Sequence, residues 1–223
     1  MSESKKALKM SDDYASEYDE SVGSKHWYGP EVLFGLMYEY LEKGQSLLDV
    51  GIGTGMSARF FHQAGLQIYG VDGSGEMLKI CKKKGIANDL EKLDLTIFSE
   101  PFPDKKFNHI ISNGVFHIIG DLEPVFKILS LKIKSGGIFG FTVDDKVISE
   151  KDDYREFKIE GIYYKKHVQS DIVIYKHQEE YILDILQRFG YELLKKLKFL
   201  AFLDEENNIS YYFTAYITRK LDS

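Results

Sequence analysis

Residues Leu48-Asp49-Val50-Gly51-Ile52-Gly53-Thr54-Gly55 decide the fold class of this chain. The apolar run that begins at Ser46 ends in this glycine cluster, as a short buried strand does when it turns into a helix. Glycine tolerates both a tight turn and the close approach of a ligand to the backbone. The sequence therefore predicts a strand over residues 46–50, a glycine turn, and a helix over residues 54–64.

Similar units follow along the rest of the chain, where apolar runs alternate with amphipathic stretches. The predicted strands are residues 46–50, 67–72, 86–93, 107–112, 138–143, 192–202 and 209–218. This alternation indicates an α/β fold with a Rossmann-like, mostly parallel seven-stranded sheet and helices on both faces. The polar loop 204–208 reads as a hairpin connection, so we expect the last strand to be antiparallel to its neighbour.

We interpret residues 1–223 as a single domain. Its expected parts are a flexible segment 1–10, two N-terminal helices within 11–44 that begin near Ser11 and Gly29, a cofactor-binding core 46–143, an insertion 144–173, and a C-terminal helix and hairpin 174–223. The insertion interrupts the alternation after the fifth strand and is rich in tyrosine, with Tyr154, Tyr163 and Tyr164.

Composition and charge exclude several classes of protein. With 43% hydrophobic residues the chain can bury an ordinary core, and its formal charge of -6 disfavours binding to bulk nucleic acid or to an anionic membrane. The one cysteine, Cys81, cannot form an intrachain disulfide or build a thiolate metal site alone, so we expect no metal and a reducing, cytoplasmic location. The first ten residues lack the apolar stretch of a signal peptide, and no apolar run is long enough to span a membrane.

Two acidic residues at strand ends, Asp49 and Asp72, indicate the kind of ligand. Ligands of open α/β sheets bind beyond the carboxyl ends of the strands, where Asp72 can accept both hydroxyls of a ribose. The pattern G-x-G-x-G puts the third glycine at Gly55, one residue earlier than in the dinucleotide fingerprint, and a carboxylate at Asp49 suits a cation better than a pyrophosphate. S-adenosylmethionine (SAM), an adenosine with a sulfonium and an amino acid tail, meets these requirements.

From about Tyr14 to Ile217 the sequence resembles the class I SAM-dependent methyltransferases, in particular the type 11 methyltransferase domain. The resemblance rests on residues 48–55, on 69–78, on the loop 101–107 and on the turn at 136–137. Asn108 replaces the aspartate that is usual in the family, and we interpret this difference as structural.

The resemblance implies roles for individual residues. Asp72 would hold the ribose, Met77 would lie near the adenine, and Asp94 with Leu95 would meet the adenine amino group. Residues 113–117 would line the methyl side of the cofactor. The residues expected to bind SAM, or S-adenosylhomocysteine as its product, are Asp49, Gly51, Gly53, Thr54, Gly55, Asp72, Gly73, Met77, Asp94, Leu95, Asn113, Gly114, Tyr18 and Trp27.

The expected activity is transfer of a methyl group from SAM to a small-molecule acceptor by in-line displacement, in a monomer or homodimer without nucleic acid or membrane partners. His117 is the candidate catalytic residue, as a base or an orienting donor, although a histidine there can also simply pack against the cofactor. The insertion is expected to lie over the carboxyl ends of the strands and to set the choice of acceptor, with an oligomer interface as the alternative.

Two other functions remain open at this point. A SAM-binding regulatory module without turnover would have the same sequence features, because methyl transfer needs no diagnostic side chain. A nicotinamide-dependent oxidoreductase would need the third glycine at position 56, which is Met56 here.

Overall fold

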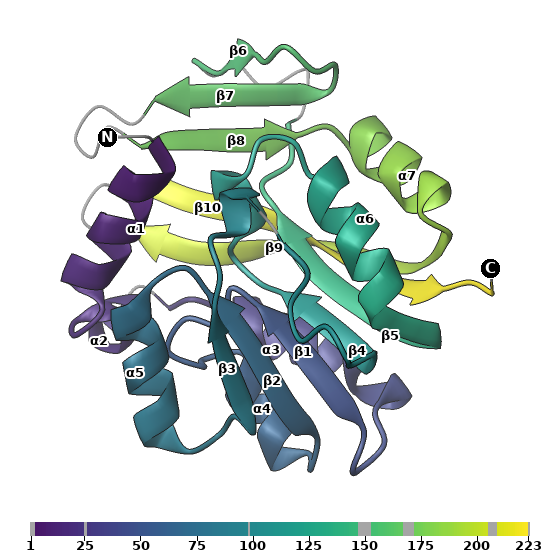
Figure 1. The fold of residues 1–223 in the computed structure, drawn as a ribbon. Helices are drawn as coiled ribbons and strands as arrows, with labels where there is room; N and C mark the ends of the chain where they lie inside the picture. Colours follow the sequence, from purple (N-terminus) through teal and green to yellow (C-terminus); the bar gives the residue numbers. More distant parts are fainter. Residues whose placement is uncertain are drawn as a thin grey trace.

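The computed structural model describes residues 3–24, 26–97, 99–146, 153–166, 172–204 and 209–222. A seven-stranded sheet with the strand order β3-β2-β1-β4-β5-β10-β9 forms its centre (Figure 1). Its strands are β1 (Ser46–Val50), β2 (Gln67–Asp72), β3 (Asp89–Lys92), β4 (Phe107–Ser112), β5 (Ile133–Val143), β9 (Tyr191–Asp204) and β10 (Ile209–Lys220). The pairs among β1 to β5 are parallel, and β10 is antiparallel to both β5 and β9. The predicted sheet with its antiparallel last strand is confirmed.

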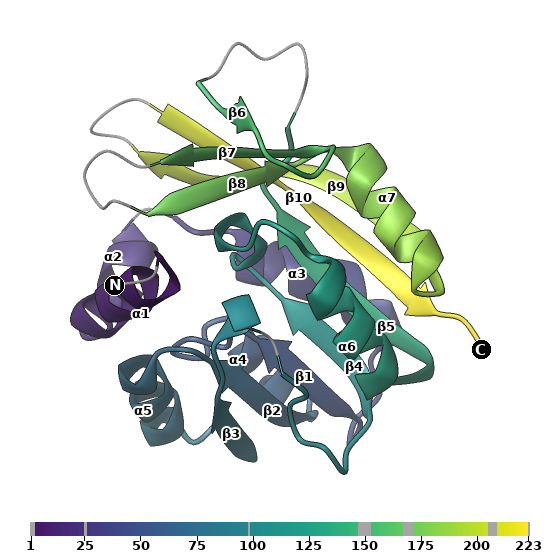
Figure 2. The same cartoon turned by 45° about the horizontal axis from the view of Figure 1, so that its top comes forward.

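Helices cover both faces of this sheet (Figures 1 and 2). On one face lie α3 (Gly29–Met37), α4 (Ala58–Gln63) and α5 (Gly75–Lys84), and on the other lie α6 (Glu123–Lys132) and α7 (Glu179–Arg188). Side chains alternate along β1, so that Leu47 packs in the core under α3 to α5 and Leu48 in the core under α6 and α7. Because both faces are buried, the strand is mostly apolar, which is why a short apolar run marks it in the sequence.

The N-terminal segment differs from the prediction. Residues 1–10 were expected to be flexible and the first helix to begin near Ser11, but α1 spans Glu3–Tyr14 and α2 follows at Tyr18–Ser24. The flexibility of residues 1–10 stays a prediction, but the first helix begins earlier than expected. The reason is a tertiary contact: α1 packs against α5, and the Leu8 side chain occupies the space beside Gly73.

Three predicted boundaries also shift. The helix after the glycine turn begins at Ala58 and not at residue 54, since residues 51–57 remain in the loop. Strand β3 covers only Asp89–Lys92 of the expected residues 86–93. Strand β5 begins at Ile133, so Gly136 and Gly137 lie inside the strand, where the register with β4 shifts. Short 3-10 helices complete the core: η1 (Tyr38–Tyr40), η2 (Leu95–Ile97) and η3 (Phe116–Ile118).

The described part of the insertion and the residues just after it form a second, three-stranded antiparallel sheet, for which the sequence predicted no elements. It consists of β6 (Arg155–Glu156), β7 (Ile162–Lys166) and β8 (Val173–His177), while residues 147–152 and 167–171 lie outside the described residues. This small sheet lies beside β9 and β10 in Figure 2, and β8 contacts η3. No helix of the described chain is long and apolar enough to cross a membrane.

Candidate cofactor site

A pocket of about 320 Å³ lies beyond the carboxyl ends of β1, β2, β3 and β4. One wall is the N-terminal segment, with Leu8, Met10, Ser11, Tyr14 and Tyr18, and the opposite side is the sheet edge. The pocket brings together eleven of the residues that the sequence singled out: Gly51, Gly53, Asp72, Gly73, Met77, Asp94, Leu95, Asn113, Gly114, Tyr18 and His117. Asp49, Thr54, Gly55 and Trp27 are not among its lining residues.

Asp72 is held in place by the backbone on both sides. Its Oδ2 accepts a hydrogen bond from the N–H of Gly53 at 2.9 Å, and its Oδ1 accepts one from the N–H of Ser74 at 2.8 Å. Burial raises the pKa of the Asp72 carboxyl, and these two donors act in the opposite direction. The carboxylate therefore joins the glycine loop to the start of α5, and each oxygen keeps a lone pair for a ligand hydroxyl.

Asp49 lies directly beneath the glycine loop with 1% of its surface exposed. Its Oδ2 has no hydrogen-bond partner among the described residues. Burial, together with the nearby charge of Asp72, raises the pKa of Asp49 well above its ordinary value. A buried carboxyl oxygen without a partner is costly, and a cationic group close to it would offset that cost.

The glycines of the loop serve two different purposes. At Gly55, where φ is +89°, a Cβ would lie 2.2 Å from the Cδ1 of Ile86, so this glycine permits close packing between the loop and the segment before β3. At Gly53, where φ is +53°, a Cβ would meet no atom within 4 Å. The space beside Gly53 belongs to the pocket, and it leaves the backbone open to a ligand.

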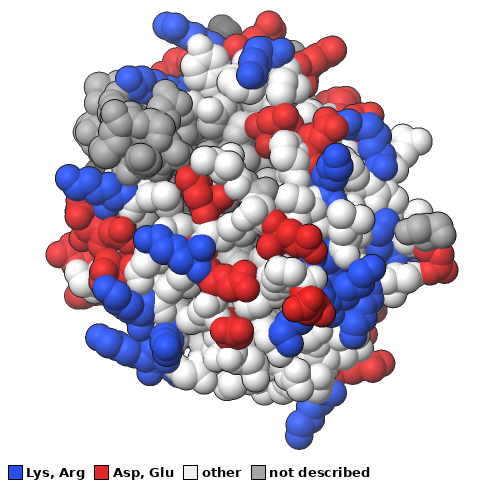
Figure 3. Space-filling view, viewed as in Figure 1, with Lys and Arg blue, Asp and Glu red and all other residues white. Residues whose placement is uncertain are grey.

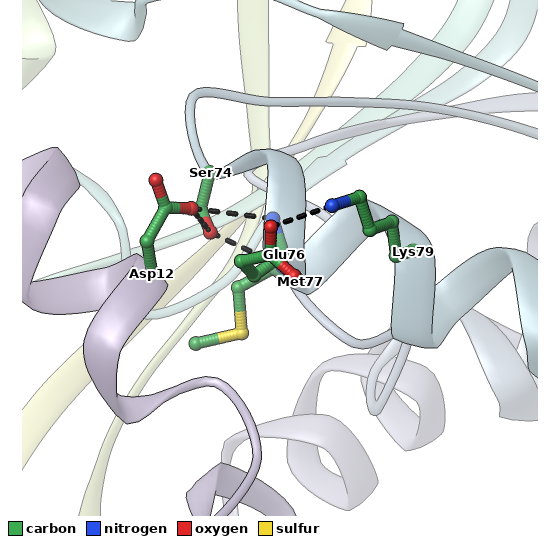
Figure 4. A network of polar contacts seen from close by, with 5 residues as sticks. All are labelled: Asp12, Ser74, Glu76, Met77 and Lys79. Carbon is green, nitrogen blue, oxygen red and sulfur yellow. Dashed lines mark hydrogen bonds and ion pairs between the residues drawn. The ribbon is translucent and has the colours of Figure 1, made fainter.

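Thr54 faces the N-terminal segment instead of the pocket. It is 1% exposed, and its hydroxyl donates a hydrogen bond to Asp19 of α2, which also pairs with Lys84 of α5. A second contact of the same kind joins α1 to α5. Figure 4 shows Asp12 pointing from α1 to the N-terminal end of α5, where its Oδ1 accepts hydrogen bonds from the Ser74 hydroxyl and from the N–H of Glu76.

Sequence reasoning missed Asp12 and Asp19 as residues that hold this wall. The pattern that places the wall was present, because Met10, Tyr14 and Tyr18 are spaced four residues apart and all three line the pocket. The Tyr14 and Tyr18 rings meet edge to face at 5.9 Å, and burial beside Asp72 raises the pKa of Tyr18 to about 12. Tyr18 is therefore a neutral hydrogen-bonding group at the pocket.

On the sheet side, Asn113 and Gly114 are fixed by Thr142 of β5. The Thr142 hydroxyl donates to the Asn113 Oδ1 at 3.0 Å and accepts from the Gly114 N–H at 2.8 Å, while the Asn113 amide donates to the Ser57 hydroxyl at 3.0 Å. Trp27 packs behind Gly114, with its Cζ2 3.2 Å from the position of a Cβ there. Trp27 thus supports the strand end from outside the pocket.

Asp94 forms a local turn at the far end of the pocket. Its Oδ1 accepts from the N–H of Thr96 at 2.9 Å and from the hydroxyl of the same residue at 2.7 Å. Leu95 beside it is buried and lines the pocket. The pair therefore presents one polar and one apolar group where the resemblance expects the adenine.

His117 lies in η3, the turn that follows β4, and is half-buried with its ring 5.8 Å from that of Phe213. Its Nδ1 is buried and has no hydrogen-bond partner in the described chain. Burial, with His177 nearby, lowers the pKa of His117 to about 4, so the imidazole is neutral at physiological pH. A neutral imidazole of this kind can accept a proton or orient a ligand.

The tyrosines of the insertion do not line the pocket. The Tyr163 ring lies under the Nζ of Lys146, the Tyr154 ring faces Lys176, and the Tyr164 ring meets Phe157 edge to face. The insertion reaches the pocket through Ile172. Its expected part in acceptor choice stays a prediction, with different residues from those the sequence suggested.

Comparison with known proteins agrees with this geometry. The methyltransferase domain family model matches residues 48–141. An uncharacterized protein of Methanocaldococcus jannaschii is 28% identical over 195 residues, which are 84% of this chain and 83% of that protein. Phosphoethanolamine N-methyltransferase 2 of Caenorhabditis elegans is 26% identical over 132 residues, which are 57% of this chain but only 30% of that protein.

A solved structure with the same fold is Burkholderia thailandensis 1,6-didemethyltoxoflavin-N1-methyltransferase, crystallised with 1,6-didemethyltoxoflavin and S-adenosylhomocysteine. It superposes with a TM-score of 0.68 at 14% identity and covers 100% of this chain and 92% of that chain. The crystal structure of a SAM-dependent methyltransferase from Clostridium acetobutylicum has a TM-score of 0.65 at 19% identity, with 94% of this chain and 98% of that chain covered.

Residues 48–141 match the methyltransferase domain family, the chain has the fold of class I SAM-dependent methyltransferases, and SAM is its cofactor. The residues present fit that molecule. Asp49 offers a buried carboxyl oxygen for a cationic tail, Gly53 leaves open space beside the backbone, and Asp72 offers two oriented oxygens for a ribose.

Proposed function

We propose that this protein transfers the methyl group of SAM to a small-molecule acceptor by in-line displacement. The observation that carries the proposal is the pocket at the sheet edge, where an open glycine backbone and an oriented carboxylate meet above the unpartnered buried carboxyl oxygen of Asp49. When bound, SAM supplies a methyl group on a cationic sulfur, so the protein need only bind, orient and exclude water.

The cofactor-binding residues divide by the part of the ligand that they suit. Asp72 accepts the ribose hydroxyls with oxygens already oriented by Gly53 and Ser74. Asp49 attracts the ammonium group of the amino acid tail, since its Oδ2 has no other partner among the described residues. The adenine end is left to Met77, Asp94 and Leu95, which line the pocket together.

The acceptor side is left to residues whose rings and backbone face the remaining space. Tyr14 and Tyr18 close one side and His117 the other, with Asn113 and Gly114 beneath. Holding an acceptor in line with the transferred methyl is worth about 7–11 kcal/mol of the barrier, so orientation is the main task of these residues. The His117 imidazole is neutral, and since burial lowers its pKa to about 4 it is a weak base, so its role is to orient the acceptor.

Calorimetric titration with S-adenosylhomocysteine and with NAD tests the cofactor assignment. The expected result is saturable binding of S-adenosylhomocysteine and none of NAD, and the opposite result would overturn the assignment. Release of S-adenosylhomocysteine from SAM across a panel of small acceptors then tests turnover. Binding without turnover of any acceptor would favour the regulatory module over the enzyme.

A further inference from the structure

A second cavity of about 300 Å³ adjoins the cofactor pocket, between η3, the start of α6 and the small sheet of the insertion. Three residues line both cavities: Thr96, Ile118 and Ile172. The remaining lining residues of this side cavity are Ile119, Gly120, Asp121, Pro124, Phe157, Val173 and Tyr175. The side cavity therefore adjoins the site where the proposed reaction takes place, with these three residues shared between the two.

Most of the side chains around the side cavity are apolar. The insertion contributes the ring of Phe157, which meets the ring of Tyr175 in β8 edge to face at 5.5 Å. Among the described residues that line the side cavity, Asp121 is the one acidic side chain. Its Oδ1 accepts hydrogen bonds from the Tyr181 hydroxyl and from the N–H of Glu123, both at 3.0 Å. The carboxylate is thus directed to the start of α6, and the walls that remain suit an apolar ligand.

No lysine or arginine among the described residues lines either cavity. The charged groups that do line them are carboxylates, those of Asp72, Asp94 and Asp121. On the face drawn in Figure 3, acidic side chains are scattered over the middle of the molecule and most Lys and Arg lie toward its rim. An anionic ligand in the side cavity would lose hydration without gaining a cationic side chain as a partner.

We propose that the methyl acceptor is an uncharged amphiphile whose apolar part occupies this side cavity, while its reactive group lies at His117 in the cofactor pocket. The inference rests on the proposed function and extends it to the substrate class. It follows from the lining residues that the two cavities share, from the apolar walls of the second, and from the lack of cationic lining groups in the described chain.

Two dyes with one skeleton test the inference directly. N-phenyl-1-naphthylamine is uncharged, and 8-anilino-1-naphthalenesulfonate differs from it by one sulfonate. The protein saturated with S-adenosylhomocysteine should bind the uncharged dye with a saturable rise in fluorescence. It should bind the sulfonate at least tenfold more weakly.

Variants at Val173, a wall residue on β8, assign the binding to the side cavity. Val173→Phe fills the space and should weaken binding of the uncharged dye at least tenfold. Val173→Lys adds a cationic side chain to the wall, and the ratio of the affinities for the two dyes should shift at least tenfold in favour of the sulfonate. The matched control is Leu131→Phe, at a position that is 61% exposed on the distant end of α6. This variant should leave the binding of both dyes unchanged.

The outcomes separate this inference from the proposed function. If S-adenosylhomocysteine binds but the two dyes bind equally, or Val173→Phe binds the uncharged dye normally, the side cavity does not have this role. Turnover confined to anionic acceptors would also overturn the inference and leave methyl transfer standing. If S-adenosylhomocysteine does not bind to the wild-type protein, the proposed function fails first. The uncharged dye should also inhibit turnover of any accepted substrate, and less so in Val173→Phe.

Discussion

Asp12 is the residue whose removal best tests whether the N-terminal wall controls cofactor exchange. Helix α1 lines the pocket, and the Asp12 carboxylate joins it to α5 through the Ser74 hydroxyl and, at 3.2 Å, the N–H of Glu76 (Figure 4). Asp12→Ala removes both bonds without touching the residues that line the pocket. Asp13, the next residue of α1, is exposed and provides a matched control as Asp13→Ala.

The size of the effect follows from the two hydrogen bonds. A bond to a charged acceptor contributes about 1.5–3 kcal/mol when protected, and a half-exposed carboxylate such as Asp12 retains about 1 kcal/mol in all after screening by solvent. A loss of about 1 kcal/mol makes opening of the wall roughly fivefold more frequent. We therefore expect the dissociation rate of S-adenosylhomocysteine to rise roughly fivefold in Asp12→Ala and to stay unchanged in Asp13→Ala.

The chain carries its own probe for this measurement. Trp27 is its one tryptophan, and it packs behind Gly114, a residue that lines the pocket. Stopped-flow fluorescence after mixing the loaded protein with excess SAM gives the dissociation rate. Equal rates in the two variants would refute the reasoning, because the helix would then open without breaking the Asp12 contact. The bonds from Ser74 and Glu76 lower the pKa of Asp12 overall, so the difference between the variants should persist at pH 5.

Four further outcomes are expected. Asp72→Ala should weaken S-adenosylhomocysteine binding at least tenfold by calorimetry. It should also lower the melting temperature, since two backbone donors lose their acceptor, and Asp72→Asn should recover part of that stability. Gly53→Val should abolish binding by filling the open space, at a cost in stability of about 1–2 kcal/mol from its left-handed backbone, and normal binding would contradict the assignment. Because the pKa of Asp49 is raised in the folded protein, the free energy of unfolding without cofactor should fall as pH rises from the ordinary carboxyl pKa to the raised one. Urea titrations over this pH range should show that Asp49→Asn removes the fall. Burial lowers the pKa of His177 to about 4, so the stability that neutral His177 contributes is present above pH 6.5 and is lost as pH falls toward 4. The loss in the free energy of unfolding should be about 2 kcal/mol at pH 5. His177→Gln should flatten this pH dependence, and His62→Gln, at an exposed position, should leave it unchanged.

The local pattern of the sequence determined the sheet and the nature of its ligand. Strands buried on both faces must be apolar, and turns with left-handed backbone need glycine, so β1, β2 and β4 and the loop from Gly51 to Gly55 are visible without any structure. Asp72 was equally predictable, because parallel topology alone brings the end of β2 next to that of β1. The class of cofactor followed from these neighbouring elements.

Tertiary structure alone decided how the remaining residues are used. Thr54 looks like part of the glycine loop in the sequence, yet its hydroxyl bonds to Asp19, 35 residues earlier. Helix α1 has a polar sequence and is held by packing of Leu8 on Gly73 and by Asp12 on α5, and the walls of the side cavity come from η3, α6 and the insertion. Such contacts join segments far apart in the chain, and their energy depends on shapes that appear only when the segments pack, so no local period of the sequence records them.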